Sequence, residues 1–318
     1  MTDIDCTEDP GFTPEPIEIS DDALHLPKGL CHIETWYYDA RFTTHQSMAL
    51  VISVLQLGRQ SVVLAGSYLY NGTQLEASTR HVYLPHRVHL SQERPSIQVG
   101  DHHILKGSLD NATGQWTYDI NLSDEDTAMH LTLTKIAEGW KGNHPLGWWL
   151  VIPRFSVKGT ITHNGKTVSV EGEGYHDHNI YSLTAPLKAQ GYHFGTVGGS
   201  SLHVAWARVT PRSSPEMKIF ILNNQTSEPI SITPDDIQFS ILATEEDSGE
   251  IIPTEFTLSV DTADIKGDLH FETLSHHCIR LPFIRYWRYH QNITGTLTYG
   301  DVTEDIDTVD FSELLTFF

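Results

Sequence analysis

Hydrophobic and polar positions alternate along most of the chain in short runs, and no run keeps a helical period for three turns. The runs are rich in β-branched and aromatic residues and are separated by Gly, Asn, Asp or Pro, which is the pattern of strands joined by turns. The predicted strands are 36–42, 47–57, 61–70, 81–90, 115–122, 129–136, 155–163, 166–174, 192–197, 202–209, 218–222, 237–243, 255–260, 268–274 and 293–299. The pattern therefore predicts an all-β protein.

The number of strands favours two β-domains, because roughly sixteen strands exceed what one small barrel uses. The segment 139–153 breaks the alternation with three glycines and two prolines, and its tryptophans indicate a packed connection. We therefore expect an irregular leader at 1–30, an N-terminal β-domain at 31–150 and a C-terminal β-domain at 151–318. The tail, 301–318, fits either a last strand or a short helix.

Composition excludes several classes of partner. The 318 residues carry 20 Lys and Arg against 41 Asp and Glu, a formal charge of −21. Such a chain repels phosphate backbones and anionic headgroups, so we expect no nucleic-acid or membrane-surface binding. No apolar stretch has the length of a membrane span, and residues 1–20 have neither the basic nor the apolar region of a signal peptide.

Asparagine sequons point to a compartment. Five of the nine asparagines stand in Asn-x-Ser/Thr sequences, an excess that favours glycosylation: Asn71, Asn111, Asn121, Asn224 and Asn292. We therefore predict a secretory-pathway or secreted protein, with a cytoplasmic location as the alternative. Three cysteines, Cys6, Cys31 and Cys278, allow at most one disulfide, for which Cys6 with Cys31 is the first pairing to test.

A polar cluster follows the strongest hairpin signal of the chain, Asn164-Gly165. In the outgoing strand, alternation places His176 and His178 on the face of Val168 and Val170, and Asp177 on the other. A bulge at Gly172 or Gly174 would instead turn Asp177 inward. Polar groups at the end of a core strand are costly unless they line a cavity or are paired.

Three interpretations of Gly174-Tyr175-His176-Asp177-His178-Asn179 remain open. The first is a satisfied polar network at a strand end. The second is a metal site made by His176 and His178 with His193 or His203 as a third ligand, which lacks the carboxylate that a cupin pattern supplies a few residues later. The third is general acid/base catalysis by Asp177 beside an imidazole in an apolar cavity. We favour the third and assign no metal.

These residues resemble the Gly-Tyr-His-Asp-His-Asn motif of the carotenoid 1,2-hydratase and AttH-like family, and Trp36-Tyr37-Tyr38-Asp39-Ala40 is similar to the aromatic-Asp-Ala segment that opens those proteins. Segments 191–195 and 204–208 are similar to that family's aromatic-Gly and Trp-containing strands. The family's usual Trp-Gly is replaced here by Ile180-Tyr181, which argues against a carotenoid substrate. The resemblance implies two lipocalin-like β-domains with a ligand cavity at or near their junction.

The same resemblance implies an enzyme of fungal secondary metabolism, since the sequons favour a eukaryotic member. We expect a cofactor-independent lyase or pericyclase: acid-assisted loss of water gives a quinone methide, which a terpene alkene traps in a hetero-Diels-Alder step. Hydration of a prenyl alkene and non-catalytic carriage of a hydrophobic ligand are the alternatives. The expected partner is a hydrophobic terpenoid or polyketide, and a homodimer is left open.

Roles follow from position in the motif. The predicted catalytic residues are Asp177, His176, His178 and Tyr175. The predicted substrate-binding residues are Trp36, Tyr38, Asn179, Lys188, Tyr192, His193, Trp206, Arg285 and Trp287. For the tryptophans a place in the β-domain core is an equal alternative, and for Lys188 an exposed loop position is the better one. An arginine at 285 could hold a phenolate or tropolonate oxygen.

Overall fold

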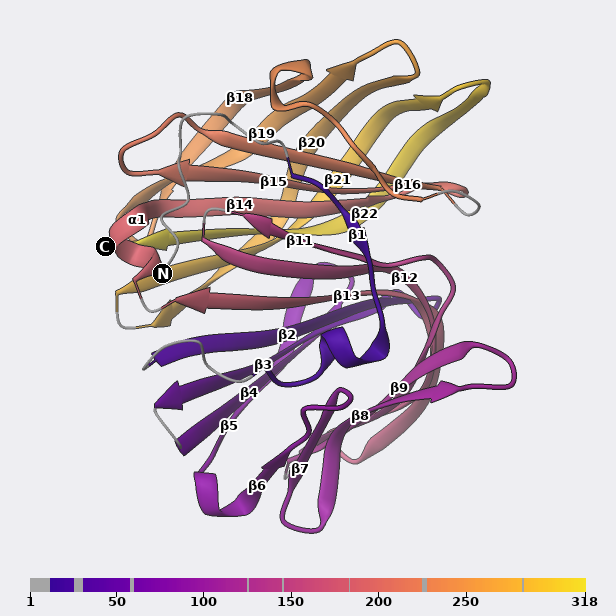
Figure 1. Ribbon diagram of the computed structural model, residues 1–318, viewed down its shortest axis with the longest axis vertical. Helices are drawn as coiled ribbons and strands as arrows, with labels where there is room; N and C mark the ends of the chain where they lie inside the picture. The colour runs from indigo at the N-terminus through magenta and orange to yellow at the C-terminus, as the bar shows by residue number, and fades with distance from the viewer. Residues whose placement is uncertain are drawn as a thin grey trace. The chain divides into compact units, whose positions relative to one another are not determined.

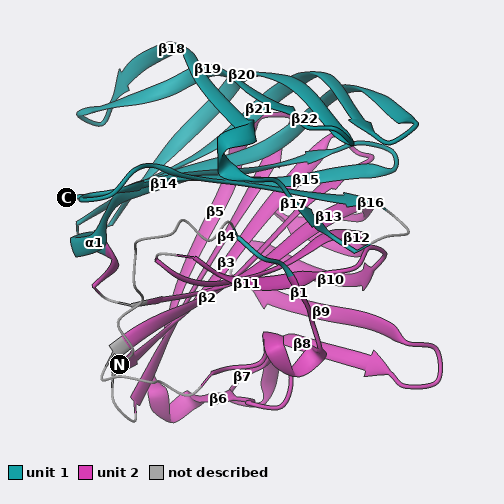
Figure 2. Cartoon of the chain, turned by 45° about the horizontal axis from the view of Figure 1, so that its top comes forward, with its two compact units in different colours: residues 1–14, 186–318 teal, residues 15–185 magenta. Residues whose placement is uncertain are grey.

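The computed structural model describes residues 12–25, 31–57, 60–124, 126–144, 146–182, 184–224, 228–281 and 283–318. It divides into two compact units, which Figure 2 shows in different colours. One unit is Glu15–Ala185, and the other is residues 186–318 joined by 12–14. Both units consist of antiparallel strands, so the predicted all-β class is confirmed.

The first unit is built on one curved, barrel-like sheet (Figure 1). Its strands follow the order β5-β4-β3-β2-β13-β12-β10-β9-β8-β7-β6, while β11 pairs with β12 and β1 with β11. The strands are β1 (Glu15–Pro16), β2 (Cys31–Phe42), β3 (Gln46–Leu57), β4 (Gln60–Asn71), β5 (Gln74–Tyr83), β6 (Val88–Leu90), β7 (Ser96–Val99), β8 (His102–Asp110), β9 (Gln115–Ser123), β10 (Thr127–Lys135), β11 (Trp140–His144), β12 (Gly147–His163) and β13 (Lys166–Ser182). Short 3-10 helices are η1 (Ile19–Asp22) and η2 (Pro85–Arg87).

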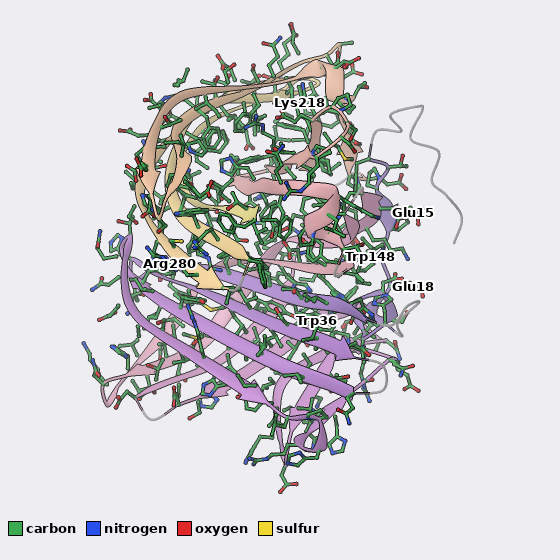
Figure 3. All side chains as sticks on the ribbon, turned by 90° about the vertical axis from the view of Figure 1, so that its left-hand side faces the viewer. Glu15, Glu18, Trp36, Trp148, Lys218 and Arg280 are labelled. Carbon is green, nitrogen blue, oxygen red and sulfur yellow. The ribbon has the colours of Figure 1, made fainter. Side chains whose placement is uncertain are left out.

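Alternation along these strands sends one set of side chains to the interior of the first sheet. On β2, Trp36, Tyr38, Ala40 and Phe42 belong to a continuous hydrophobic core, as do Leu50 and other residues of the neighbouring strands. Side chains fill the interior of each sheet (Figure 3). The period of two in the sequence is thus the period with which residues enter this core.

The predicted hairpin joins β12 to β13. Asn164 and Gly165 both have positive φ, 49° and 73°, and His163 pairs with Lys166 across the turn. Two positive φ angles match the right-handed twist of the flanking strands, which explains the Asn-Gly sequence. This turn fixes the register of the whole of β13.

The leader packs into the first unit. Ile17, Ile19 and Leu24 contact the core of the first sheet, and Asp22 at the end of η1 is completely buried. The predicted leader at 1–30 therefore contributes β1, η1 and a carboxylate to this unit, in the part of it that the structure describes. Apolar residues at 17, 19 and 24 supply the burial that keeps this segment in place.

The predicted domain boundary at 150/151 falls inside β12, whereas the compact units divide after Ala185. Within the first sheet, Gly142 lies inside β11, Gly147 begins β12, and Pro153 falls at a register shift between Ile152 and Phe155. Trp140 and Trp149 pack edge to face at 4.9 Å on neighbouring strands. A break in alternation here marks a bulge and a short hairpin, which local sequence does not distinguish from a linker.

The second unit holds a half-barrel sheet in the order β17-β16-β15-β14-β22-β21-β20-β19-β18. Its elements are α1 (Ala185–Lys188), which starts at the last residue of the first unit, β14 (Ala189–Gly198), β15 (Leu202–Pro211), β16 (Met217–Asn224), β17 (Ile230–Ser231), η3 (Pro234–Asp236), β18 (Ile237–Asp247), β19 (Glu250–Asp261), β20 (Ile265–Leu281), β21 (Ile284–Tyr299) and β22 (Val302–Phe317). Trp206, Phe220, Phe256 and Phe271 lie in its core. The tail is strand β22, so the strand alternative holds.

Three of the five sequon asparagines are exposed. Asn71, Asn111 and Asn121 are exposed, and Asn224 and Asn292 are half-buried. Cys278 is a half-buried free thiol, while the predicted pairing of Cys6 with Cys31 involves Cys6, which lies outside the described residues. Among the residues that the structure describes, no helix has the length and hydropathy to cross a membrane.

Candidate functional site

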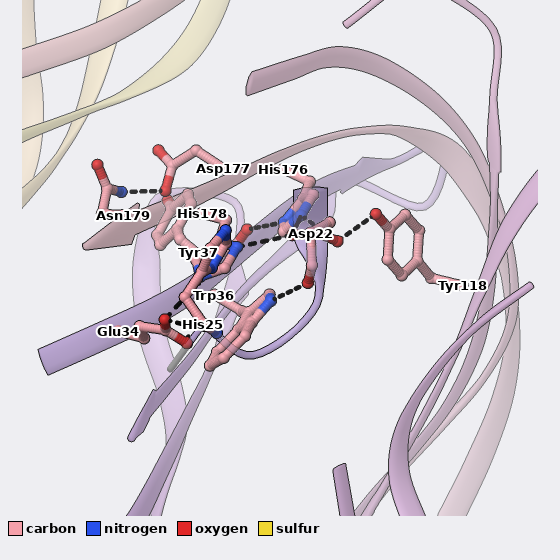
Figure 4. A network of polar contacts seen from close by, with 10 residues as sticks. All are labelled: Asp22, His25, Glu34, Trp36, Tyr37, Tyr118, His176, Asp177, His178 and Asn179. Atoms are coloured by element: carbon pink, nitrogen blue, oxygen red, sulfur yellow. Dashed lines mark hydrogen bonds and ion pairs between the residues drawn. The ribbon is translucent and has the colours of Figure 1, made fainter. Parts of the chain in front are cut away.

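Strand β13 presents its polar motif on two faces. It pairs with β2 without a register shift from Gly172 to Ser182, so the alternation set by the hairpin persists through both glycines. His176 and His178 consequently point to the core side of the first sheet, as predicted, whereas Asp177 and Asn179 lie on the opposite face (Figure 4). Tyr175 shares that opposite face by alternation. Glycine is needed at 172, because a Cβ there would lie 1.9 Å from the carbonyl oxygen of Arg41.

The carboxylate beside the two imidazoles is Asp22. His176 Nε2 lies 3.1 Å from both oxygens of Asp22, and His178 Nδ1 lies 3.1 Å from Oδ1. The hydroxyl of Tyr118 donates to Oδ2. Asp177 is thus not the partner of these histidines, because strand alternation directs it to the other face.

Burial and charge set the protonation of this cluster. Burial alone would raise the pKa of Asp22, but His176 and His178 outweigh it and hold the pKa of the carboxyl well below its usual range. Burial and the charge of Asp22 raise the pKa of Tyr118 far above its usual value. Asp22 is therefore a buried anion, and Tyr118 is a neutral donor to it.

Aromatic rings hold both imidazoles in place. Trp36 stacks on His178 at 4.2 Å and Tyr38 on His176 at 4.1 Å, measured between ring centroids. His176 Nδ1 donates to the carbonyl oxygen of Tyr37 at 2.8 Å, and Trp36 Nε1 donates to the carbonyl oxygen of Asp22 at 2.9 Å. Trp36 and Tyr38, predicted to bind substrate, are here buried supports of His176 and His178.

A second carboxylate, Glu34, lies near His178 on the side away from Asp22. Its oxygens are 3.3 Å from His25 Nδ1, 3.7 Å from His32 Nε2 and 3.8 Å from His178 Nε2. Burial would raise the pKa of Glu34, but these three histidines lower it well below its usual range. His178, between Glu34 and Asp22, has a raised pKa: burial lowers it, and its contacts with both carboxylates more than offset that effect.

Sequence reasoning missed Asp22, His25, His32 and Glu34. The alternation of β2 extends back from Trp36 to Glu34 and His32, which places all three on the inner face. That signal was readable, although the predicted strand began at 36. No local pattern reveals Asp22 or His25, because only the packing of the leader brings them to this site.

The other face of β13 carries a separate buried group. Tyr175 Oη donates to Asp177 Oδ2 at 3.0 Å, and Asn179 Nδ2 donates to Asp177 Oδ1 at 2.7 Å. On β2, Asp39 is opposite Tyr175 and Tyr37 is opposite Asp177. Asp39, Tyr37, Tyr175 and Asp177 are all buried, so two carboxylates and two phenols share an enclosed face.

In the second unit, His193 is enclosed by aromatic rings. Ring centroids of Trp206, Phe256, Phe239 and Tyr289 lie 4.9, 5.0, 5.8 and 6.0 Å from that of His193. Burial, with the charge of Arg208 as a smaller cause, lowers the pKa of His193 to about 3. His193 and Trp206 are therefore brought together, with a neutral imidazole in an apolar interior.

The remaining predicted residues are dispersed. Trp287 is buried and donates from Nε1 to Asp247 Oδ2 at 2.7 Å. The guanidinium of Arg285 lies 4.7 Å over the ring of Phe318. Lys188 is exposed at the end of α1, and Tyr192, next to His193 on β14, points to the opposite face of that strand.

No family model and no curated protein matches the sequence. Solved structures do match. An AttH-like protein from Nitrosomonas europaea is 13% identical, with 96% of this chain and 98% of that chain covered and a TM-score of 0.66. CghA with Sch210972 is 10% identical, with 93% and 94% covered and a TM-score of 0.62. Kievitone hydratase from Nectria haematococca is 11% identical, with 95% and 93% covered and a TM-score of 0.56.

These similarities establish the fold. The chain shares the lipocalin-like fold of AttH-like proteins over more than nine tenths of its length, as the sequence motif predicted. At 10 to 13% identity they do not transfer an activity.

Proposed function

We propose that the chain is a lyase-type enzyme that removes water from, or adds it to, a hydrophobic small molecule, with Asp177 as the acid/base residue. The observation that carries this proposal is the buried Asp177 carboxylate held between Tyr175 and Asn179. A carboxylate in a low-dielectric setting and in contact with a phenol can exchange protons with a bound molecule. The fold is shared with kievitone hydratase and with CghA, whose structure contains the small molecule Sch210972.

The hydrogen bonds on Asp177 suit it to act as a base. Tyr175 and Asn179 both donate to its oxygens, and donors stabilise the anion. In the proposed dehydration, Asp177 takes the proton of a substrate phenol while the benzylic C–O bond breaks. Tyr175 gives its proton to the leaving hydroxide, and Asp177 returns a proton to Tyr175. The substrate thereby loses one water and becomes a quinone methide, with no cofactor required by the balance.

A dehydrating cyclase is the leading form of this proposal. The quinone methide would react with a terpene alkene in a hetero-Diels-Alder step, which needs two apolar partners held in one orientation. Buried aromatic side chains support this: Tyr37 is paired with Asp177, Tyr175 donates to it, and Trp149 is paired with the neighbouring Asn179. A prenyl-alkene hydratase uses the same residues in the opposite sense, and the shared fold with kievitone hydratase favours it as the second candidate.

The decisive variant is Asp177→Asn, which keeps the size of the side chain and removes the base. We expect turnover of a prenylated phenol or benzylic alcohol to be lost and ligand affinity to be nearly unchanged. Asp268→Asn, at an exposed position of β20, is the matched control. Product formation by Asp177→Asn at the wild-type rate would refute the role of Asp177.

Isotopic water separates the candidates. A hydratase incorporates ¹⁸O from labelled water into a stable tertiary alcohol, whereas a dehydrating cyclase releases the substrate oxygen and forms a ring ether without that label. Binding without any product in the wild-type chain would instead indicate a hydrophobic ligand carrier.

The exposed sequons support a second, independent proposal about compartment. Asn71, Asn111 and Asn121 are accessible to a glycosyltransferase, and their modification would place the chain in the secretory pathway. An endoglycosidase should reduce the mass of the protein from its native source. An unchanged mass would favour the cytoplasmic alternative.

A further inference from the structure

Three histidines and one glutamate converge at one end of the inner face of the first sheet. His32 and Glu34 come from β2, His178 from β13, and His25 from the segment after η1. The ligand-type atoms of His25, Glu34 and His178 lie within 4.8 Å of one another (Figure 4). His32 Nε2 adds a fourth such atom, 3.7 Å from Glu34 Oε1.

Hydrogen bonding does not account for this convergence. His25 Nδ1, His32 Nε2, Glu34 Oε2 and both ring nitrogens of His178 are buried, and none forms a hydrogen bond of regular geometry with a described residue. Buried polar atoms of native proteins are normally satisfied, so three such imidazole nitrogens around the Glu34 carboxylate call for a ligand. Glu34 Oε1 is the exception, since it accepts the backbone N–H of His25 at 2.8 Å.

We propose that His25, Glu34 and His178, with His32 as a fourth ligand, form a site for a divalent transition-metal ion such as Zn²⁺. Imidazole nitrogens and a carboxylate are the donor set that such ions prefer. Bonds of about 2.0–2.1 Å in a tetrahedral site place ligand atoms about 3.3 Å apart. The three histidine nitrogens lie 3.3, 3.7 and 3.8 Å from the nearest Glu34 oxygen, close to that spacing.

The surroundings of His178 fit the role of a metal ligand. With Nε2 facing Glu34, its Nδ1 lies 3.1 Å from Asp22 Oδ1. Metal-bound histidines typically contact a carboxylate through the second ring nitrogen, which fixes the ring orientation. Asp22 is itself held by His176 and Tyr118, and Trp36 stacks on the His178 ring, so this ligand is rigid before any ion binds.

Charge and access agree with this assignment. Asp22 and Glu34 are two buried carboxylates on either side of His178, and a divalent cation would balance both charges. His25 is the entry side, because its side chain is 36% exposed while that of His178 is fully buried. The ring of Trp148 packs edge-on against both His25 and His178 and shields the remainder of the site.

Metal binding by the full chain tests the proposal directly. The protein is stripped with a chelator, and Zn²⁺ binding is measured by competition with a chromophoric chelator and by metal analysis. We expect one equivalent bound per chain, with the affinity reduced more than about 10-fold in His25→Ala and Glu34→Gln. His270→Ala is the matched control, since His270 pairs with Glu255 at 2.8 Å on the second sheet in a half-exposed, two-residue contact.

Two further measurements keep the test decisive if a buried variant folds poorly. His25→Ala changes a partly exposed side chain outside any strand, so the variant should keep the packing of the sheet and fold normally. Co²⁺ in the wild-type chain should give the intense visible bands of a four-coordinate ion, and these should be lost in His25→Ala. Failure to bind Zn²⁺ at micromolar concentration, or equal binding by His25→Ala and wild type, would overturn the site.

Variants of Asp22 and His32 test the supporting carboxylate and the fourth ligand. Asp22→Asn should weaken Zn²⁺ binding by about 10–100-fold while leaving the Co²⁺ spectrum four-coordinate, as expected for a group that orients a ligand. His32→Gln should also weaken binding. Unchanged binding by His32→Gln would remove His32 from the ligand set.

Discussion

His176 and Asp22 stand 154 positions apart in the sequence, yet His176 Nε2 lies 3.1 Å from both carboxylate oxygens of Asp22. This contact fastens the segment before β2 inside the first sheet. Both side chains are completely buried, so each depends on the other for its compensation. The contact gives the leader a structural role that its proline-rich, acidic sequence does not suggest.

Asp22→Asn should therefore destabilise the chain strongly. Removing one member of a buried pair leaves the other uncompensated. We therefore expect the free energy of unfolding to decrease by about 3–5 kcal/mol. Urea unfolding of chelator-treated protein measures it without interference from a bound ion. The neighbouring Asp21→Asn is the control: Asp21 pairs with Lys141 at a partly exposed position, so its loss should cost less than about 1 kcal/mol.

Asp177 and Asp22 show which parts of the site could be predicted from the sequence. The hairpin at Asn164-Gly165 and the alternation after it placed His176 and His178 inside and Asp177 outside, because strand register is a local property. The residue paired with the imidazoles was not readable. Asp22 reaches them through the packing of a separate segment, and nothing in a single sequence encodes that pairing.

The same distinction holds for the fold, of which only the local features could be predicted from the sequence. All-β class, the strand character of the regions around the motif and the strand in the tail follow from alternation and turn residues. The position at which the units separate does not, because Pro153 causes a register shift within a sheet rather than a linker. Local irregularity is therefore evidence of a break in pairing, and long-range contacts decide whether a domain ends there.

His193 should make the stability of the second unit depend on pH. Its pKa is lowered to about 3, whereas an unfolded histidine titrates near about 6.5, so below that pH the unfolded state binds a proton that the folded state does not. Stability should fall as the pH decreases from about 6.5 towards about 3. Within that window, this residue should lower the free energy of unfolding by about 1.4 kcal/mol for each unit by which the pH decreases.

His193→Phe removes this titration and keeps a ring among Trp206, Phe239 and Phe256. Urea unfolding between pH 7 and pH 4 should show a smaller loss of stability in the variant than in the wild type. His89→Phe, at an exposed position of β6, should follow the wild-type curve. Parallel pH profiles for wild type and His193→Phe would contradict the neutral, buried state of this imidazole.

Arg288 and Glu313 form a buried ion pair on the second sheet. Nε and Nη2 of Arg288 each lie 3.2 Å from Glu313 Oε1, and Nη2 also donates to the Tyr286 hydroxyl at 2.8 Å. Glu313→Gln removes the charge that is paired with the buried guanidinium, so we expect a loss of about 3–5 kcal/mol in the free energy of unfolding. Glu216→Gln, which breaks the more exposed pair with Arg208, should cost less than about 1 kcal/mol. Equal effects of the two variants in urea unfolding would show that burial does not set the strength of these pairs.

Gly172→Ala should disturb the strand pair that presents the motif. A Cβ at this position would lie 1.9 Å from the carbonyl oxygen of Arg41 and 2.9 Å from Cα of Phe42, and backbone atoms of a paired strand have little room to move. Overpacking of this kind costs about 1–3 kcal/mol. Gly66→Ala is the matched control on β4, since its Cβ would meet the Tyr68 side chain at an ordinary 3.5 Å. Strand β2 carries Glu34, and β13 carries Asp177 and His178. Gly172→Ala should therefore also lower the catalytic rate and the Zn²⁺ affinity together. Normal stability and normal Zn²⁺ affinity in Gly172→Ala would contradict the close β2–β13 approach on which both proposed sites depend.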